Sequence, residues 1–388
     1  MKILLHHRIA SRDGQAVHLE ELAAALSAQG HQTLLVGPPG LQAASFGGSS
    51  SVVDSIKRLL PGAVYELLEI VYNVAAFFRL RASVRAFQPD IIYERFSLFL
   101  LAGSWMRRLS GLPVLLEVNS PLYEERLKND GLKLHAIGRW FQRRLWNSAD
   151  YVLPVTHVLA RTVREYGVPA DRIAVIPNGI NPARFQNAIE TSAAKESLGL
   201  PARLTLGFIG FIRSWNAVHR VVDFLAAHGE RYNLHFLVVG DGPARESLLA
   251  HAASLGVSHR ITVTGVVDRD DVAAYIAAMD IALLPGLTEY SSPLKLFEYM
   301  YLGRAIVAPD TANIREILTD RQDAVLFDPG LPGAMEKALA ELCEDAAMRG
   351  RIGTRARATI DEKALTWNRN AERVVALAES AMRHRNIR

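Results

Sequence analysis

The segment over residues 289–303 carries side chains whose types and spacing suit a phosphorylated ligand. It reads Glu-Tyr-Ser-Ser-Pro-Leu-Lys-Leu-Phe-Glu-Tyr-Met-Tyr-Leu-Gly. Ser292 suits a helix N-cap and Pro293 the first helical position, which leaves the next N–H groups and the positive end of the helix dipole to an anion. Lys295 adds a cation, and Glu298 lies one turn on, within reach of ribose hydroxyls. The pattern predicts a diphosphate site; the alternative is an ordinary Ser-Pro helix start with a salt-bridged Glu298.

Two glycine-containing turns follow predicted strands further upstream. The first, Gly-Phe-Ile-Gly-Phe-Ile-Arg over residues 207–213, places Arg213 where it can hold a phosphate through two hydrogen bonds. The second is Val-Gly-Asp-Gly-Pro over residues 239–243. Each turn by itself occurs in many α/β proteins, so together they only support the phosphate site.

Polar residues also follow strands in the first half of the chain. Asn119 comes after the run 114–118 and offers a neutral amide to a ligand, or caps the next turn. Glu94 and Arg95 follow another run, where they would orient an acceptor or form a surface ion pair. His18 is a candidate acceptor contact. Among the twelve histidines no spacing with Asp, Glu or Cys indicates a metal site.

The elements that must position these residues form two series of short apolar runs separated by helix-length segments. The runs are 3–5, 33–36, 90–93, 114–118 and 151–155, then 204–210, 234–239, 261–265, 281–284, 305–307 and 324–327. This alternation predicts parallel strands in two doubly wound α/β domains, with ligands at the carboxyl ends of the strands and in the cleft between them. We expect domains over residues 1–180 and 181–365, a linker over 181–201, and a final helix over 366–388.

Composition excludes several classes of protein. The 388 residues are 49% hydrophobic and 22% charged, which is typical of a folded chain and not of a disordered one. A single cysteine, Cys343, excludes a disulfide scaffold, and the early charges of the amino terminus do not resemble a signal peptide. We therefore expect a cytoplasmic protein that does not bind nucleic acid.

Charge is distributed unevenly between the two halves. Residues 1–180 hold 20 basic and 15 acidic residues, whereas residues 181–388 hold 24 and 25. Within the basic half, apolar residues recur at helical spacing between Asp54 and Gln88 and are flanked by Lys and Arg. A pair of core-packed helices explains this segment, and so does an amphipathic element on an anionic bilayer.

Taken together, these motifs resemble the retaining glycosyltransferases of family 4, also called glycosyl transferases group 1. The resemblance spans almost the whole chain: the Gly14 loop ahead of the first helix, the Gly-Asp-Gly-Pro turn, the block over residues 292–300, and a last helix that begins near Trp367. It implies the GT-B fold, two Rossmann-like domains facing a central cleft, with the last helix crossing back to the first domain. It also implies a UDP- or GDP-sugar donor held by the second domain, an acceptor held by the first, and no metal or other cofactor.

The resemblance assigns roles to individual residues. Arg213 resembles the phosphate-clamping arginine, Lys295 a second cation on the diphosphate, and Asn119 a contact of the donor sugar; these three form the candidate catalytic set. Asn216 stands where relatives commonly have a lysine, and Tyr290 where they have the first glutamate of the signature. The candidate donor-binding residues are Gly14, Gly210, Asn216, Gly240, Asp241, Gly242, Val266, Glu289, Tyr290, Ser291, Ser292, Leu294 and Glu298. The candidate acceptor-binding residues are His18, Glu94 and Arg95.

The expected function is sugar transfer, with retention of configuration, from a nucleoside diphosphate to an acceptor hydroxyl. A lipid-linked or polysaccharide intermediate of the bacterial cell surface is the expected acceptor, met at the inner face of the cell membrane through a peripheral contact. Two alternatives remain open at this point: a partner subunit that binds a nucleotide-sugar without turnover, and a sugar-nucleotide epimerase of the same fold.

Overall fold

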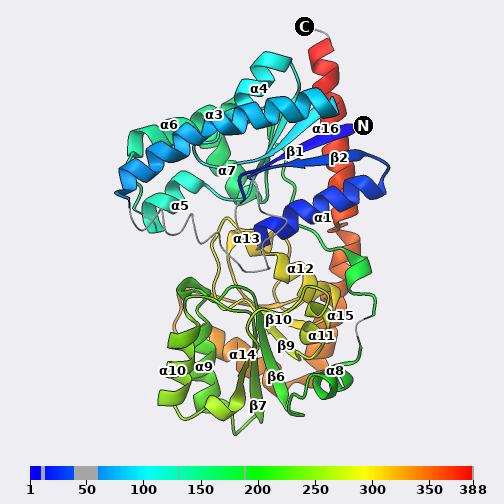
Figure 1. The fold of residues 1–388 in the computed structure, drawn as a ribbon. Coiled ribbons are helices and arrows are strands. Elements are labelled where there is room, and N and C mark those ends of the chain that lie inside the picture. The colour runs from blue at the N-terminus through cyan, green and yellow to red at the C-terminus, as the bar shows by residue number, and fades with distance from the viewer. Residues whose placement is uncertain (10–13, 39–59, 130, 188, 387–388) are drawn as a thin grey trace. The chain divides into compact units, whose positions relative to one another are not determined.

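The computed structural model describes the chain except residues 10–13, 39–59, 130, 188 and 387–388 (Figure 1). Its contacts divide the described chain into two compact units. Unit 1 comprises Met1–Asn178, Tyr290–Ser292 and Trp367–Arg388, and unit 2 comprises Gly179–Glu289 and Pro293–Thr366. Each unit is built around one parallel sheet with its own cores.

Unit 1 contains a five-stranded parallel sheet in the order β2-β1-β3-β4-β5. Its strands are β1 (Lys2–His6), β2 (Gln32–Val36), β3 (Ile91–Arg95), β4 (Val114–Val118) and β5 (Tyr151–Pro154). Its helices are α1 (Gly14–Ala28), α3 (Gly62–Phe87), α4 (Ala102–Ser110), α5 (Leu122–Asn129), α6 (His135–Ser148), α7 (His157–Glu165) and α16 (Trp367–Asn386), with a 3-10 turn at Ala170–Arg172. Strands β3 and β4 are buried along their whole length, as expected where helices cover both faces of a parallel sheet.

Unit 2 contains a six-stranded parallel sheet in the order β11-β10-β9-β6-β7-β8. Its strands are β6 (Leu204–Ile209), β7 (Leu234–Val239), β8 (Ile261–Val263), β9 (Ile281–Leu283), β10 (Ala305–Pro309) and β11 (Val325–Phe327). Its helices are α8 (Thr191–Ser197), α9 (Val218–His228), α10 (Arg245–Ser254), α11 (Val272–Ala277), α12 (Leu294–Tyr301), α13 (Ala312–Arg315), α14 (Ala334–Glu344) and α15 (Ala346–Glu362), with 3-10 turns at Pro182–Arg184, Ser214–Asn216 and Ser258–Arg260.

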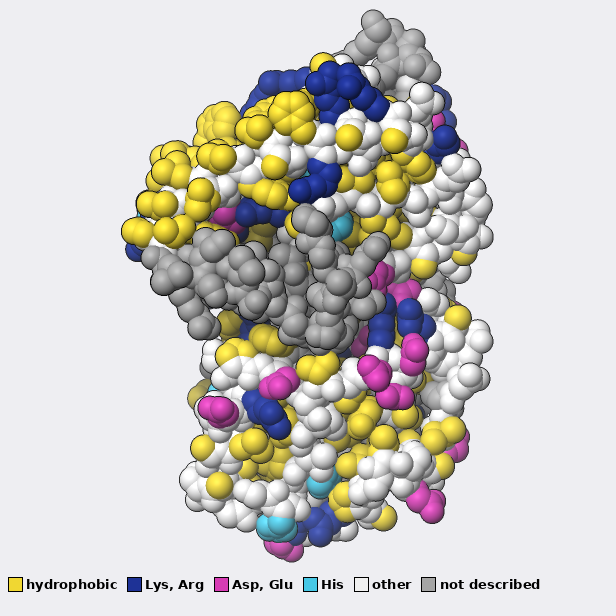
Figure 2. All heavy atoms as spheres, in the orientation of Figure 1, with side chains coloured by type: hydrophobic (Ala, Val, Ile, Leu, Met, Phe, Trp, Pro, Cys, Tyr) yellow, Lys and Arg dark blue, Asp and Glu magenta, His cyan; other side chains and the backbone are white. Residues whose placement is uncertain are grey.

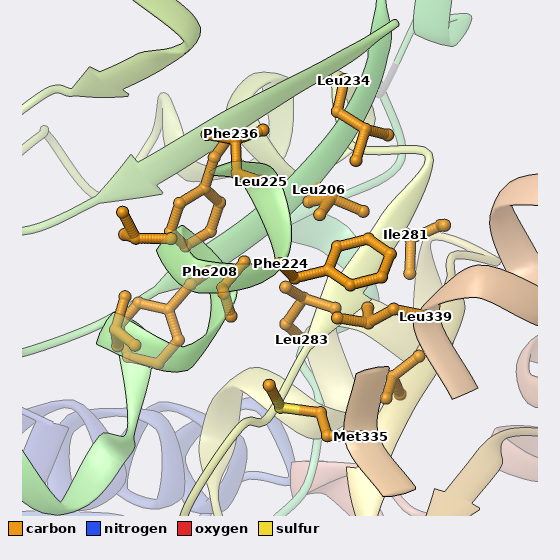
Figure 3. Packing of buried hydrophobic residues seen from close by; sticks show 14 of the residues in the cluster. Leu206, Phe208, Phe224, Leu225, Leu234, Phe236, Ile281, Leu283, Met335 and Leu339 are labelled. Carbon is orange, nitrogen blue, oxygen red and sulfur yellow. The ribbon is translucent and has the colours of Figure 1, made fainter. Parts of the chain in front are cut away.

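Alternate residues along the strands of unit 2 enter separate cores on the two faces of the sheet. Phe208 and Phe236 pack in one cluster with Phe224 of α9 and Leu339 of α14 (Figure 3). Ile209 enters the other cluster, which includes residues of α12. The period-two alternation of a strand produces this division, because successive side chains point to opposite faces.

The strand orders define where a ligand can bind in each unit. In unit 1 the chain leaves β1 toward β2 and later returns to β3 on the other side of β1; in unit 2 the same reversal lies between β6 and β9. The loops after two such strands diverge to opposite faces, which opens a crevice at their carboxyl ends. A ligand is therefore expected near the residues that follow β1 and β3 in unit 1, and β6 and β9 in unit 2.

Helix α16 belongs to unit 1, although the chain reaches it from unit 2. It packs on α1, and the side-chain amide of Gln29 donates to the carbonyl oxygen of Asn368 at 2.8 Å. Tyr151 Oη and Ser380 Oγ, 3.0 Å apart, join it to the start of β5. This packing confirms that the last helix returns to the first α/β unit.

Every apolar run predicted as a strand overlaps a strand of the structure, but other predictions were wrong. The stretch 181–201 is not a linker, because it contains α8 and belongs to unit 2. Of the segment 54–88, residues 60–88 contain helix α3, which leaves many of its apolar side chains exposed instead of packing them in the core, and residues 54–59 lie outside the described part. Gly14 is the first residue of α1 itself. Within the described part of the chain, no helix is both long and apolar enough to cross a bilayer.

Candidate functional site

Lys295 lies in the first turn of α12, beside the end of β6. Its ammonium nitrogen is 3.8 Å from the centre of the Phe208 ring, and a Cβ added to Gly210 would lie 2.7 Å from it. Burial lowers the pKa of Lys295 to about 7, although Glu298 acts in the opposite direction. The positive charge of this buried ammonium is therefore only partly balanced by its neighbours. An anionic ligand beside it would stabilise its protonated form.

Helix α12 begins one residue later than the sequence predicts. Pro293, not Ser292, occupies the N-cap position, and no side chain caps the helix. The Ser292 hydroxyl instead accepts a hydrogen bond from the backbone N–H of Asn178 at 3.1 Å. An uncapped start leaves N–H groups of the first turn, including those of Leu294 and Lys295, without an intrahelical partner, which is the arrangement that binds phosphates.

The glycines after β6 and β7 are needed because two segments of the chain touch there. A Cβ on Gly240 would lie 2.2 Å from the carbonyl oxygen of Gly210, and one on Gly242 would lie 2.3 Å from that of Ile212. The backbone of Gly210 and that of Gly240 have φ values of +132° and +134°. Asp241 Oδ1 accepts from the Gly242 N–H at 2.7 Å. The turn at 239–243 thus shapes the loop after β6, and the close approach that its glycines allow is to the chain's own backbone.

Arg213 is exposed and lies between two aromatic rings. Its guanidinium carbon is 4.9 Å from the centre of the Phe211 ring and 4.8 Å from that of Trp215. Asn216 Oδ1 accepts from the backbone N–H of Arg213 at 3.0 Å, so the residue that replaces a lysine shapes this turn. Gly286, after β9, lets the turn approach, because a Cβ there would lie 2.4 Å from the Trp215 carbonyl oxygen. The aromatic rings hold the guanidinium in place and leave its N–H groups available.

The other candidate donor-binding residues of unit 2 differ in how far they are exposed. Glu298 is half-buried one turn after Lys295, Glu289 is exposed, and Val266 is 49% exposed beside Gly265. Tyr299, which we did not predict, fixes α12 against β6, because its buried hydroxyl accepts from the Ile209 N–H at 2.9 Å.

The predicted 289–303 segment is shared between the two units. Tyr290, Ser291 and Ser292 belong to unit 1 by their contacts. The Tyr290 carbonyl accepts from the Thr156 hydroxyl at 3.0 Å, and the Ser292 carbonyl from the side-chain amide of Asn178 at 2.5 Å. These residues are thus held by unit 1 and not by the unit of Lys295.

In unit 1, Glu117 at the end of β4 is the centre of a buried polar cluster. Its Oε1 accepts from Arg95 at 2.5 Å and from the side-chain amide of Asn119, while its Oε2 accepts from the Tyr93 hydroxyl at 2.8 Å. His18 Nε2 lies 3.0 Å from the same Oε2. Burial alone would raise the pKa of Glu117, but His18 and Arg95 outweigh it and lower that pKa to about 2. A carboxylate that accepts four hydrogen bonds and stays ionised cannot serve as a general base near neutral pH.

His18 is buried on α1 and is held on three sides. Beyond its contact with Glu117, its Nδ1 lies 2.7 Å from Asn178 Oδ1, and its ring meets Trp367 edge-on at 4.8 Å between centres. The amide of Asn178 is oriented by its own donation to the Ser292 carbonyl. Both ring nitrogens therefore face oxygen acceptors, and His18 can donate to both only when it is doubly protonated.

Glu94 and Arg95 do not form the surface ion pair that the sequence left open. Both are more than 90% buried, and Glu94 Oε2 lies 2.5 Å from His6 Nδ1 while Arg95 binds Glu117. Gly103 makes room for the carboxylate, because a Cβ there would lie 2.0 Å from Glu94 Oε2. Glu94 and Arg95 are therefore buried residues that pair with His6 and Glu117, respectively.

Asn119 is half-buried, and its orientation is set by Glu117. Among the residues that the structure describes, its side chain bonds to Glu117 and not to the turn before α5, so the capping role is not observed. Because the amide nitrogen faces Glu117, the amide oxygen is the group that Asn119 presents elsewhere. This suits an acceptor of hydrogen bonds from a sugar hydroxyl.

In the described part of the chain, no group of three His, Cys, Asp or Glu side chains could hold a metal ion. Gly14 is exposed. Three residues near the site were not predicted from the sequence: Phe211, Trp215 and Tyr299. The first two had a detectable signal, since they are aromatic residues two positions on either side of an arginine, whereas Tyr299 had none beyond the helical period.

Two parallel α/β sheets of these orders, an uncapped helix start after β9 and a last helix that returns to unit 1 are those of a glycosyltransferase of the GT-B type, and the family models and solved structures agree. More closely, the chain belongs to Glycosyltransferase Family 4, whose model matches residues 12–184, and the model of glycosyl transferases group 1 matches residues 203–345.

The chain is similar to two proteins named as 2-deoxystreptamine glycosyltransferases. The 2-deoxystreptamine glucosyltransferase of Streptomyces kanamyceticus is 26% identical over 336 residues, which cover 81% of this chain and 85% of that protein. The 2-deoxystreptamine N-acetyl-D-glucosaminyltransferase of Streptomyces fradiae is 25% identical over 352 residues, which cover 86% and 83%.

Solved structures share the fold at lower identity. Sucrose-phosphate synthase from Thermosynechococcus elongatus superposes with a TM-score of 0.75 at 15% identity, over 98% of this chain and 99% of that one. Anabaena Alr3699/HepE in complex with UDP-glucose gives a TM-score of 0.74 at 17% identity, over 98% and 100%.

Proposed function

We propose that the protein transfers a sugar from a nucleoside diphosphate to an acceptor hydroxyl with retention of configuration. The observation that carries the proposal is Lys295, an ammonium with a pKa lowered by burial at the uncapped start of α12. A diphosphate supplies the negative charge that this position lacks. Arg213, held between Phe211 and Trp215, is the second group suited to the diphosphate.

In the proposed reaction the bond between the anomeric carbon and the diphosphate oxygen breaks while a bond to the acceptor oxygen forms on the same face. The acceptor proton passes to the leaving diphosphate. Glu117 is saturated with donors and stays ionised, which supports a route without a carboxylate base. Lys295 and Arg213 would stabilise the negative charge of the leaving group, and Asn119 would position the donor sugar, while His18 holds Glu117 and Asn178 in place.

The proposed acceptor is a lipid-linked or cell-surface glycan intermediate, and a UDP- or GDP-sugar is the proposed donor. HepE of Anabaena, which shares the fold, has been crystallised with UDP-glucose. The support for a membrane-bound acceptor is a surface of unit 1 that is described in the next subsection.

The test is a panel of UDP-, GDP- and ADP-sugars incubated with the full chain, with and without lipid-phosphate-linked saccharides and soluble aminocyclitols. We expect release of the nucleoside diphosphate only when an acceptor is present, and a product whose anomeric configuration, measured by NMR, matches the donor. An isomerised sugar without acceptor would instead identify an epimerase. Tight diphosphate binding without turnover on any acceptor would identify a binding subunit, and either result overturns the proposal.

A further inference from the structure

Helix α3 buries three polar residues on the same face as Ala76 and Leu80, and exposes a row of large apolar residues on the other. Glu66, Glu69 and Asn73 are at most 6% exposed. The exposed large apolar residues of the helix follow one another at intervals of one to four positions along a single face; they are Val64, Leu67, Leu68, Val71, Val74 and Phe78, between 42% and 63% exposed. Over the amino-terminal half of α3 this is the reverse of the pattern of a helix that packs its apolar face on a core, whereas Ala76 and Leu80 further along do pack in the core.

Specific bonds in the interior fix this orientation. Glu69 accepts from Arg126 of α5 at 2.6 and 3.1 Å and from Arg8 at 2.9 Å. Glu66 accepts from the backbone N–H groups of Lys133 and Leu134 at 2.8 and 2.7 Å, directly before α6. Rotating the helix to bury its leucines would leave these arginines and N–H groups unpaired, at a cost of several kcal/mol.

The inward amide of Asn73 adds a third anchor. It donates to the Phe99 carbonyl at 2.5 Å and accepts from the Leu101 N–H, directly before α4. The outward position of the apolar face is therefore built into the fold of unit 1.

Exposed apolar residues also lie on α4 and α6. On α4, which packs along α3, Trp105 and Leu109 are 36% and 59% exposed, and the Trp105 ring lies 6.0 Å from that of Phe77. On α6, Ile137 and Trp140 are 39% and 54% exposed. Figure 2 shows hydrophobic side chains gathered over the region of α3 and α4, with Lys and Arg beside them. An exposed apolar area of this extent marks an interaction surface.

The charges around this surface have one sign. Helices α3, α4 and α6 contain eight arginines and two acidic residues, Glu66 and Glu69, which are both buried. Arg81 and Arg85 continue the exposed face of α3 at helical spacing from Phe78, and Arg108 of α4 is exposed. The exposed face of the three helices is thus apolar and cationic, with no exposed carboxylate on them.

We propose that the exposed apolar faces of α3, α4 and α6 dock on a membrane that contains anionic lipid. Leu, Val and Phe side chains enter the interfacial region, Trp105 and Trp140 lie at its polar boundary, and the arginines bind lipid phosphates. A second copy of the chain is a poorer occupant, because a twofold contact would place these arginines against one another without a carboxylate between them.

If the acceptor is lipid-linked, as proposed above, this surface is where unit 1 would contact the membrane that contains it. Only this link to the acceptor rests on the proposed function. Binding to vesicles is measured without donor or turnover. A failure to dock and a failure to transfer sugar are therefore separate results.

The test is co-sedimentation of the full chain with vesicles of phosphatidylcholine alone or mixed with phosphatidylglycerol. We expect binding to the mixed vesicles that weakens as salt is raised. The triple variant Leu67→Gln, Val71→Gln, Phe78→Gln should lower partitioning at least tenfold. The double variant Arg81→Gln, Arg85→Gln should lower it about tenfold or more on anionic vesicles only, since each cation near an anionic bilayer contributes about fivefold.

Matched controls come from unit 2, where Leu249, Leu255 and Leu331 are comparably exposed. Leu249→Gln, Leu255→Gln, Leu331→Gln, and separately Lys337→Gln with Arg351→Gln, should leave partitioning unchanged. The proposal is overturned if the unmodified protein ignores anionic vesicles, or if the control and surface variants behave alike. It is also overturned if the protein forms a dimer that the triple variant dissociates and shows no vesicle binding, which would assign the surface to a second copy.

Discussion

The polar residues at the strand ends of the two units differ in how their charges are compensated. In unit 1, Glu117 accepts from four groups, and Glu94 pairs with His6. In unit 2, Lys295 faces an aromatic ring, and burial outweighs the effect of its neighbouring carboxylate. The first arrangement is complete without a ligand and serves to hold geometry, whereas the second is improved by an anion. This contrast leads to five measurements, beginning with the largest expected effect.

Lys295→Ala should lower kcat by about 10²–10³-fold, because it removes one preformed charge from the leaving group. Turnover is measured as acceptor-dependent release of nucleoside diphosphate. The control is Lys337→Ala, an exposed lysine in the first turn of α14, which should keep the rate of the unmodified enzyme. A Lys295→Ala enzyme within a few-fold of the unmodified rate would refute our placement of the diphosphate.

Glu117→Gln should lower the free energy of unfolding by about 3 kcal/mol, roughly a hundredfold in the folding equilibrium, since Arg95 and His18 lose their buried counter-charge. Urea unfolding followed by tryptophan fluorescence measures it, and four of the five tryptophans lie in unit 1. Affinity for nucleoside diphosphate should not change. If Glu117→Gln lost diphosphate binding and kept its stability, Glu117 would be a ligand-binding group and not the structural carboxylate described above.

The same carboxylate predicts a pH dependence with a defined sign. Because the folded-state pKa of Glu117 is lowered to about 2, the stability it contributes is present above about pH 4.5 and is lost as the pH falls toward 2. Glu117→Gln should flatten this part of the stability curve. Glu362→Gln is the matched control. Glu362 pairs with Arg355 at the exposed surface of α15, so this change should leave the free energy of unfolding nearly unchanged.

Arg213→Ala should lower kcat/KM about 10- to 100-fold, the effect of losing one charge-assisted contact to phosphate. Arg231→Ala provides the comparison, because Arg231 lies 4.9 Å from the centre of the Tyr232 ring and is likewise exposed. Equal effects of the two changes would show that the aromatic contact matters and the phosphate contact does not.

The smallest effect concerns the titration of Lys295. Because burial lowers its pKa to about 7, the free enzyme loses the binding-competent ammonium as the pH rises through 7. Affinity for nucleoside diphosphate should fall about fivefold between pH 7 and pH 8, with proton uptake on binding. Calorimetry in buffers of different ionisation enthalpy measures that uptake. In Lys295→Met both the fall in affinity between pH 7 and pH 8 and the proton uptake on binding should disappear. If they persist, a group other than Lys295 is responsible for them.

Much of the fold was predictable because strands in a parallel sheet are short apolar runs with helices between them. Every such run became a strand. The prediction that the apolar residues of 54–88 pack in the core was wrong for much of α3, because apolar spacing marks one face of a helix without saying which face is buried. In α3, Glu66 and Glu69 have partners far along the chain, and those partners turned the carboxylates inward.

The site was predictable in part. The spacing of Lys295 and Glu298 indicated the start of a phosphate-binding helix, and the structure placed it one residue later because Ser292 binds Asn178. No local pattern joined His18 to Glu117, Asn178 and Trp367, since these residues are far apart in the sequence.

By itself, the sequence determined the two α/β sheets, the family motifs and the order of the strands along the chain, all of which depend on residues that are close in sequence. The tertiary structure alone decided which charges are compensated and which are not. It buried Glu117 among four donors, left Lys295 over Phe208, and turned the apolar face of α3 outward. Compensation of a charge depends on the distance to groups from other elements, and that distance exists only once the chain has folded.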